Sequence, residues 1–240
     1  ALPFTRLRQC DLDGLMLRSI QREIIQNLAY GTNAKVMSGY TTRPWWDRHN
    51  ASGLLTSDRP IQQGWDSTIG QESGTSGVWT NFLGGDQGVA CGLGTPEEWV
   101  DARLDDLDTI WPGTRAAWDG TAVRMHWPTF EHALGSYTCY AVGQWAYWSL
   151  EGRRSGNAHF CGEHCSLDFQ GWMEGGAETG ALVALEIMDD HGISAPERAR
   201  LAVGRKLALP QACYHGDLVG PLHPRTLGAR RRQLTGKVPR

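Results

Sequence analysis

The sequence predicts an α/β fold, in which segments with helical periodicity alternate with β-prone segments along the chain. Residues 15–28 and 97–111 repeat apolar side chains at helical spacing. Residues 78–83 and 123–127 are instead β-prone runs, and each ends at a glycine or proline turn signal. About 40% of the 240 residues are apolar and eleven are tryptophan. This globular composition supplies enough side-chain volume for a sizeable core, in one large domain or two small ones.

The N-terminal segment predicts one helix followed by a strand. The helix covers residues 15–28, where one face carries Leu17, Ile20, Ile24 and Leu28. Asp13 is a candidate N-cap, and Gly31 lies just past the C-terminal end. A strand is expected to start at residues 35–37. Residues 47–77 are rich in Gly, Ser, Thr and Asp, which favours loops and short strands over helix.

The middle of the chain predicts two strands around a well-marked helix. The strand at 78–83 ends at Gly84 and Gly85, and the strand at 123–127 ends at Pro128. Between them, Thr95 and Glu98 form a capping box with proline at the first helical position. The helix that follows places on one face Val100, Leu104, Leu107 and Trp111.

The C-terminal part predicts a strand and two helices. Residues 158–161 are expected to form a short buried strand, and a helix is expected from Met173, with one face made by Met173, Ala177, Ala181, Leu185 and Met188. Gly175, Gly176 and Gly180 each weaken this helix by about 1 kcal/mol relative to alanine. Such glycines indicate the close approach of a neighbouring element or of a ligand. A further helix is expected from a capping box at residues 194–197.

Charge and hydropathy bear on the classes of partner. With 23 basic and 26 acidic residues, the chain gives no electrostatic argument for nucleic acid. No run of about 18 apolar residues occurs, so no membrane span is expected. Six cysteines in 240 residues do not make a disulfide scaffold. They fit a reduced compartment, so a soluble protein is expected, with the cytoplasm favoured and the localisation otherwise open.

The tail after Asp217 contains basic residues and no acidic ones. We expect it to be solvated or to face a partner, and a polyanion site is the alternative.

The most informative stretch is residues 160–176, which read as strand, loop and glycine-rich helix start. Unpaired backbone N–H groups and the positive end of the helix dipole point out of such a start. The geometry therefore suits an anion, although many helices begin in this way.

Residues 160–180 resemble, nearly residue for residue, the C-terminal pattern of flavin monoamine oxidases and L-amino-acid oxidases. That pattern reads F-x-G-E-x-T/S, followed by G-Y/W-M/I-E/D-G. The resemblance implies that Glu163 bonds the ribityl chain of FAD, and that the isoalloxazine ring lies against Gly171, Trp172 and Met173. The cofactor-binding residues expected from it are Gly162, Glu163, Gly171, Trp172, Met173, Gly175 and Gly176.

Three other stretches resemble the same family in the same order. Residues 28–35 resemble its L-x-Y-G-x-x-x-K segment, which implies that Lys35 holds a water against flavin N5. Residues 43–58 resemble its R/K-F-W…G…T-D segment and residues 84–88 its G-G-x-x-G turn. We assign these last two no catalytic role.

Residues 127–140 resemble the family's W…G-G-C-Y-T segment. This implies that Tyr137 and Trp172 are the two aromatic side chains that guide the amine toward the flavin, so Lys35, Tyr137 and Trp172 are the candidate catalytic residues. Some members attach FAD covalently through a cysteine where this chain has Ser136, so we expect non-covalent FAD. Trp65 stands where L-amino-acid oxidases place a substrate-binding tyrosine, and joins Tyr137 and Trp172 as a substrate-lining candidate.

A flavin amine oxidase needs a dinucleotide-binding unit with a G-x-G-x-x-G turn. The nearest match, at Gly92 and Gly94, lacks the third glycine. We therefore expect one chain of a two-chain enzyme, with proteolytic processing as one origin, whose second chain carries the N-terminal FAD-binding half. A dimer of such heterodimers is a possible assembly of the enzyme.

The expected domains are a C-terminal part of a Rossmann-like FAD domain (1–13 and 130–192), a substrate-binding domain (14–129) and an extension (193–240).

The resemblance implies FAD-dependent oxidative deamination of a small amine or an L-amino acid by molecular oxygen. The products would be an imine, then an aldehyde or keto acid, with ammonia and hydrogen peroxide. Simple amines, polyamines and L-amino acids all stay open as substrates. A non-catalytic partner subunit with the oxidase fold is one alternative. A zinc site at His159, Cys161, His164 and Cys165 is another, but their spacing is not a usual ligand pattern, and we expect no metal.

Overall fold

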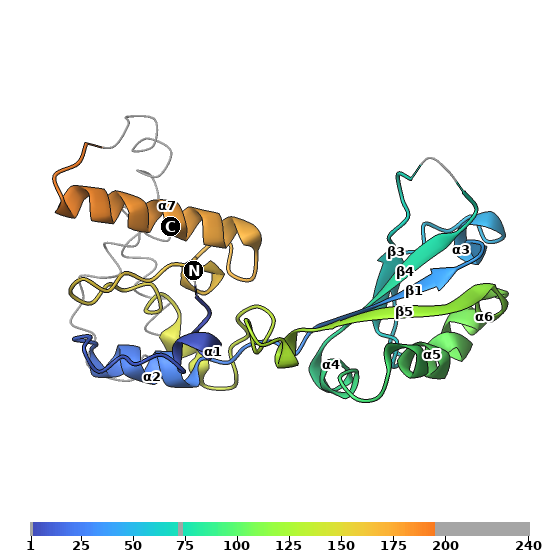
Figure 1. The fold of residues 1–240 in the computed structure, drawn as a ribbon, viewed down its shortest axis with the longest axis horizontal. Helices are drawn as coiled ribbons and strands as arrows, with labels where there is room; N and C mark the ends of the chain where they lie inside the picture. Colours follow the sequence, from blue (N-terminus) through green and yellow to red (C-terminus); the bar gives the residue numbers. More distant parts are fainter. Residues whose placement is uncertain (1, 72–73, 195–240) are drawn as a thin grey trace, which may run out of the picture. The chain divides into compact units, whose positions relative to one another are not determined.

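The computed structural model describes residues 2–71 and 74–194. In chain order the elements are α1 (Phe4–Leu7), α2 (Ser19–Asn27), β1 (Ala34–Tyr40), α3 (Pro44–Asp47), β2 (Leu55–Thr56), β3 (Gln63–Asp66), β4 (Gly77–Leu83), α4 (Gly85–Ala90), α5 (Pro96–Ile110), α6 (Thr114–Ala117), β5 (Trp118–His126), η1 (Trp127–Thr129), η2 (Gln144–Tyr147), η3 (Glu163–Cys165) and α7 (Met173–Asp190) (Figure 1). The mixed helix and sheet content confirms the predicted α/β class.

The chain divides into two compact units, at Tyr30/Gly31 and at Ser136/Tyr137. The sequence placed these divisions at 13/14 and 129/130. The first difference arises because α2 buries Ile24 and Ile25 in one cluster with Phe4, so the helix belongs with the residues before it. The assignment of the two units to cofactor and substrate stays a prediction.

The unit from Gly31 to Ser136 is built on a five-stranded sheet in the order β2-β3-β4-β1-β5, in which all strand pairs are antiparallel. β1 lies between β4 and β5 and buries every second side chain. Because side chains alternate across a strand, Ala34, Val36 and Tyr40 face the core, and Lys35 and Met37 face the other side.

Helix α5 supplies much of the core that covers one face of this sheet. The buried cluster includes Trp99, Val100, Leu104 and Leu107 from α5, together with Val36 and Trp79 from the strands. The predicted capping box is confirmed, because Thr95 Oγ1 accepts from Glu98 N–H at 3.1 Å and Glu98 Oε2 accepts from Thr95 N–H at 2.8 Å. A cap of this kind contributes about 1 kcal/mol to helix stability.

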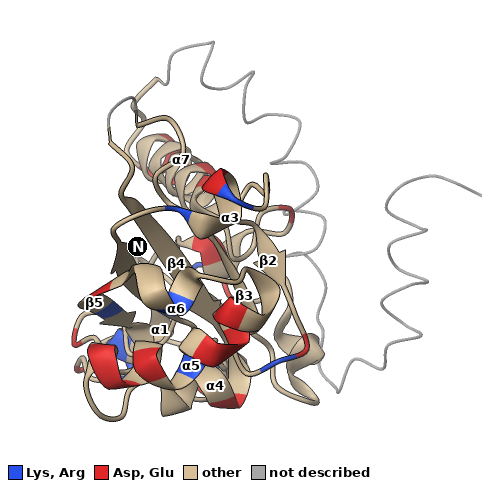
Figure 2. Ribbon diagram, turned by 90° about the vertical axis from the view of Figure 1, so that its right-hand side faces the viewer, with Lys and Arg blue, Asp and Glu red and all other residues tan. Residues whose placement is uncertain are grey.

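The outer side of α5 is acidic, as Figure 2 shows in red. Arg115 of the same unit binds two of its carboxylates, Asp101 Oδ1 at 2.9 Å and Asp105 Oδ1 at 2.8 Å. Such exposed ion pairs contribute at most about 1 kcal/mol each and are weakened by salt. We read this helix surface as a solvated face.

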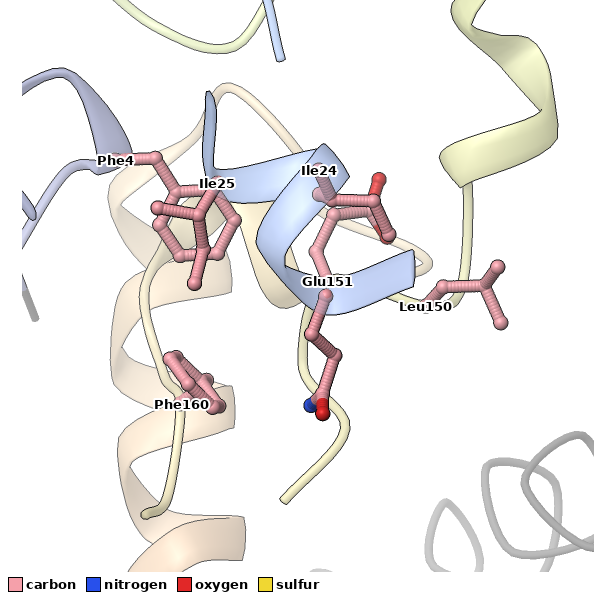
Figure 3. A pocket seen from close by; sticks show the side chains of 7 residues that line it. Phe4, Ile24, Ile25, Leu150, Glu151 and Phe160 are labelled. Atoms are coloured by element: carbon pink, nitrogen blue, oxygen red, sulfur yellow. The ribbon is translucent and has the colours of Figure 1, made fainter. Parts of the chain in front are cut away.

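The other unit joins the residues up to Tyr30 with those from Tyr137 onward. Its core cluster contains Phe4, Leu17, Ile24, Ile25, Leu28 and Leu150. Figure 3 shows a small pocket in this core, where Glu151 lies near the apolar side chains of Ile24, Phe4 and Phe160, and Gln21 also lines it. Burial among them raises the pKa of Glu151 to about 7, although the Tyr140 hydroxyl donates a hydrogen bond to its carboxylate.

Two sequence expectations need correction, and two others concern residues at or beyond the end of the described part. The strand at 158–161 was wrong: within the described residues this segment makes only the isolated bridge between Ser155 and Ala158, so no ladder forms. The first helix starts at Ser19 rather than at residue 15, because Arg18 is extended and serves as N-cap in place of Asp13. Apart from Ser194, the helix expected from the capping box at 194–197 and the basic tail lie outside the described residues.

Helix α7 confirms the prediction of a helix from Met173. Neither α7 nor any other helix in the described ranges is long and apolar enough to cross a bilayer.

Candidate active site

The loop between Gly162 and Trp172 is fastened to α7 by one buried threonine. Thr179 Oγ1 accepts from Gly162 N–H at 2.9 Å and donates to the Gly175 carbonyl at 2.7 Å. The backbone of Gly162 has a φ of 144°, a conformation that favours glycine. Thr179 therefore fixes the start of this loop, and with it η3, against the first two turns of the helix.

The structure requires glycine at one position of α7 and not at two others. A Cβ built at Gly175 would lie 2.4 Å from the carbonyl oxygen of Phe169, so the loop itself needs the glycine there. At Gly176 the nearest such atom is the backbone nitrogen of Glu163, at 4.0 Å, and at Gly180 no described atom lies within 4 Å. Close approach of a neighbouring element thus explains Gly175 without any ligand.

Glu163 is held by protein hydrogen bonds on both carboxylate oxygens. Oε1 accepts from the Thr138 N–H at 2.9 Å and from the Thr138 hydroxyl at 2.8 Å. Oε2 accepts from the Gly171 N–H at 2.6 Å. A carboxylate offers about four acceptor sites, so one remains on Oε2. The expected bond to a ribityl chain would have to use that last site.

The structure brings the two candidate aromatic residues to neighbouring backbone positions. The ring of Tyr137 lies against Gly171, since a Cβ built at Gly171 would lie 3.7 Å from Tyr137 Cδ2. Trp172 follows directly and is the N-cap of α7, which has no side-chain cap. Trp172 is 71% exposed, Met173 95% and Tyr137 41% within the described residues. Large apolar side chains and free helix N–H groups therefore stand together at this helix start.

The rival zinc site is not assembled. Nδ1 of His159 lies 2.7 Å from Glu186 Oε2, and the ring of His164 packs on Phe4 with centroids 4.4 Å apart. Burial lowers the pKa of His164 to about 4, and its Nε2 has no hydrogen-bond partner. In the part of the chain that the structure describes, no group of three or more His, Cys, Asp or Glu is placed to hold a metal ion.

Lys35 lies in the other unit, on the sheet face opposite the core. Its strand neighbours are Phe82 on β4 and Met125 on β5. The Nζ atom lies 5.6 Å from the ring centroid of Trp65 and 5.7 Å from that of Phe82. Among the described residues Lys35 has no carboxylate within ion-pair distance. The structure therefore places two predicted residues, Lys35 and Trp65, side by side.

Ser136 closes this unit. Its hydroxyl donates to Asn33 Oδ1 at 2.7 Å, and its N–H donates to the Gly31 carbonyl at 2.8 Å. The hydroxyl is thus committed to a protein partner.

Sequence reasoning missed Phe82, Thr138 and Thr179. Strand pairing would have placed Phe82 opposite Lys35. Thr138 lies beside Tyr137 in a stretch already singled out, but nothing in the sequence shows that it meets Glu163. Thr179 carries no local signal, because threonine inside a helix commonly bonds a preceding carbonyl.

The chain is similar to flavin enzymes along most of its length. Residues 10–188 match the family model described as flavin containing amine oxidoreductase. The Bacillus subtilis (strain 168) protein YobN, named as an L-amino-acid oxidase, is 24% identical over 193 residues, which are 78% of this chain and 39% of that protein. A Dictyostelium discoideum protein named as flavin-containing monoamine oxidase A is 27% identical over 170 residues, 70% of this chain and 36% of that protein.

Solved structures show the same fold. Cyclohexylamine oxidase from Brevibacterium oxydans IH-35A matches with a TM-score of 0.70 and 23% identity, over 80% of this chain and 42% of that one. Wild-type putrescine oxidase bound to putrescine matches with a TM-score of 0.68 and 20% identity, over 79% and 42%. The chain thus spans about two fifths of the length of these relatives.

Proposed function

This chain belongs to the family of flavin containing amine oxidoreductases, and from that premise we propose that it takes part in the FAD-dependent oxidative deamination of a small amine or an L-amino acid. The observation that carries the proposal is the arrangement at the start of α7. There one carboxylate, Glu163, joins the segment of Tyr137 to the segment of Trp172.

The residues present fit a flavin. The N-terminus of α7 has backbone N–H groups without a side-chain cap, and the dipole of this helix favours negative charge there. Exposed Trp172 and Met173 offer apolar surface to a flat ring. Glu163 Oε2 keeps one acceptor site for a hydroxyl. These residues would hold the cofactor, with Gly162, Gly171, Gly175 and Gly176 shaping the backbone around them. When bound, the flavin would accept two electrons from the amine and pass them to molecular oxygen, giving hydrogen peroxide.

The side chains of this chain would perform the remaining tasks. Tyr137 and Trp172 would present electron-rich rings to the amine nitrogen and orient it. Lys35 would hold a water molecule, either for hydrolysis of the imine to ammonia and an aldehyde or keto acid or to assist the reaction of the reduced flavin with oxygen. Trp65 would line the substrate side of Lys35.

We propose further that FAD is bound non-covalently, because Ser136 stands at the position of the attaching cysteine. We also propose that a second chain supplies the dinucleotide-binding half. The support for this proposal is that residues 1–240 contain no G-x-G-x-x-G turn. A dimer of such heterodimers is one assembly to look for.

The first experiment is to purify the native protein and record its absorption spectrum, a denaturing gel and intact masses. We expect an absorption band at about 450 nm from oxidised flavin, which denaturation releases, and a second polypeptide on the gel. A peroxide-coupled panel of amines, polyamines and L-amino acids then identifies the substrate.

Two results would overturn parts of this proposal. If the protein binds FAD but no compound in the panel reduces that FAD anaerobically, the chain would be a non-catalytic partner subunit. A tight, complete FAD complex of this chain alone would remove the second chain.

A further inference from the structure

We infer that Glu163 is a positioning residue, whose carboxylate sets the separation between the backbone segments that carry Tyr137 and Trp172. We call the hydrogen bonds of Glu163 with Thr138 and Gly171 the clamp, and all three residues lie in one unit of the chain. The consequence of the clamp for amine oxidation, that it fixes the width between the two guiding rings, rests on the proposed function.

The three hydrogen bonds of Glu163 reach two separate segments. Oε1 takes both donors of Thr138, which directly follows Tyr137, and Oε2 takes the N–H of Gly171, which directly precedes Trp172. These donors lie 25 and 8 residues from Glu163 in sequence. One side chain therefore ties both aromatic positions to η3.

The chemistry of the site requires a carboxylate. All three atoms that meet Glu163 are donors, and a carboxylate is an acceptor on both oxygens. An amide of the same shape accepts on one side only and would turn an NH2 group toward a donor on the other. Hydrogen bonds to an ionised acceptor are about twice as strong as neutral ones. Losing the bonds of either carboxylate oxygen therefore loosens the segment that this oxygen holds.

The backbone around Glu163 is itself held in place. Thr179 bonds Gly162, the residue before Glu163, to α7. The two held segments also touch, because the Tyr137 ring lies on Gly171, which has no Cβ and a φ of 84°. One carboxylate thus holds the residues that adjoin Tyr137 and Trp172.

Hydrogen exchange on the native flavin-loaded protein, with all its chains, tests the clamp directly. In Glu163→Gln we expect at least one of the two amides, Thr138 N–H or Gly171 N–H, to exchange at least about 10-fold faster, since the NH2 group then faces it in place of an acceptor. Amides in residues 181–188 of α7 serve as an internal reference and should not change. Glu174→Gln makes the same charge change at an exposed position in the first turn of α7, and should leave both amides protected.

Unchanged exchange at both segments would overturn the clamp. Faster exchange throughout the unit, including residues 181–188, would mean that Glu163 only supports the fold, and would overturn it too. This measurement does not depend on activity. A wild-type protein that oxidises no amine therefore refutes the proposed function and leaves the clamp to be judged by exchange alone.

A second pair of variants keeps the test valid if Glu163→Gln does not fold. Thr138→Val removes the hydroxyl donor at nearly constant volume, and Thr138→Ser retains it. We expect Thr138→Val to lower the rate of flavin reduction by the amine about 5-fold, Thr138→Ser to restore it, and the FAD content to stay unchanged. An unchanged rate of flavin reduction in Thr138→Val would overturn the positioning role, whatever the FAD content.

Discussion

The Nζ atom of Lys35 lies 5.6 Å from the ring centroid of Trp65, on the side of β1 that faces away from the core. The ring of Phe82 lies at a similar distance. Aromatic faces attract a cation without accepting a conventional hydrogen bond. The three N–H donors of the ammonium therefore stay available for water, which is what the proposed role of Lys35 requires.

Replacing Lys35 by methionine should lower the rate of amine oxidation about 10- to 100-fold, because the water loses its positioned donor. Stopped-flow measurement of flavin reduction and of reoxidation by oxygen locates the affected step. Arg59→Met is a matched control, since it removes an exposed cation of the same unit that pairs with Asp106 at 2.8 Å. Rates within about twofold of wild type in Lys35→Met would remove this residue from the mechanism.

The aromatic pair should depend on ring faces more than on polar groups. Tyr137→Phe keeps the ring and should retain amine oxidation within a few-fold. Tyr137→Leu and Trp172→Leu should each lower kcat/KM about 2- to 30-fold, the equivalent of about 0.5–2 kcal/mol of cation–π attraction. The measurement is steady-state kinetics on the best substrate of the panel. If Tyr137→Phe and Tyr137→Leu behave alike, the ring does not guide the amine.

Two glycines of α7 should respond in opposite ways to alanine. Gly175→Ala puts a methyl group 2.4 Å from the Phe169 carbonyl and should destabilise the protein by about 1–3 kcal/mol. Gly180→Ala meets no described atom within 4 Å and should be neutral or add up to about 1 kcal/mol of helix stability. Thermal unfolding of the flavin-loaded protein checks both. A Gly180→Ala variant that unfolds as early as Gly175→Ala would show that another surface covers that position.

Glu151 should make stability depend on pH. Its pKa is raised to about 7 by burial, against an ordinary value of 4.5, so the folded state favours the protonated form. Its stabilising contribution is complete below about pH 4.5 and is lost as pH rises through about 7. Relative to wild type, Glu151→Gln should therefore gain melting temperature as pH rises from about 5 to 8. The gain corresponds to at most about 3 kcal/mol.

The difference between the two proteins is the quantity to follow, because His164 acts with the opposite sign. Burial lowers the pKa of His164 to about 4 from 6.5, so its contribution is present above about pH 6.5 and is lost as pH falls through about 4. A melting-temperature difference between wild type and Glu151→Gln that stays constant over this range would show that Glu151 does not titrate in it.

Local signals in the sequence predicted much of the fold. The β-prone runs became β4 and β5, the capping box at Thr95 starts α5, and the helical pattern from Met173 became α7. Each of these depends on residues a few positions apart. The strand expected at 158–161 failed for the complementary reason, because a strand needs a partner that a local pattern does not reveal.

The candidate site divides in the same way. The resemblance identified Tyr137, Glu163 and Trp172, and the structure shows that the first and last lie on segments joined by the second. It did not identify Thr138 or Phe82, since their importance comes from contacts between distant segments. Nor did it show that the acceptors of Glu163 are mostly occupied by protein donors.

Glu163 holds the backbone beside positions 137 and 172. The kind of ring at each position and the way in which the two segments are held are therefore set by different residues. A directed-evolution library at positions 137 and 172 would vary the surface that a substrate meets, while the hydrogen bonds of Glu163 stay the same. A library at position 138 would vary how Glu163 holds these segments beneath unchanged rings. Bulkier amines are therefore best sought with the second library, and amines of different polarity with the first.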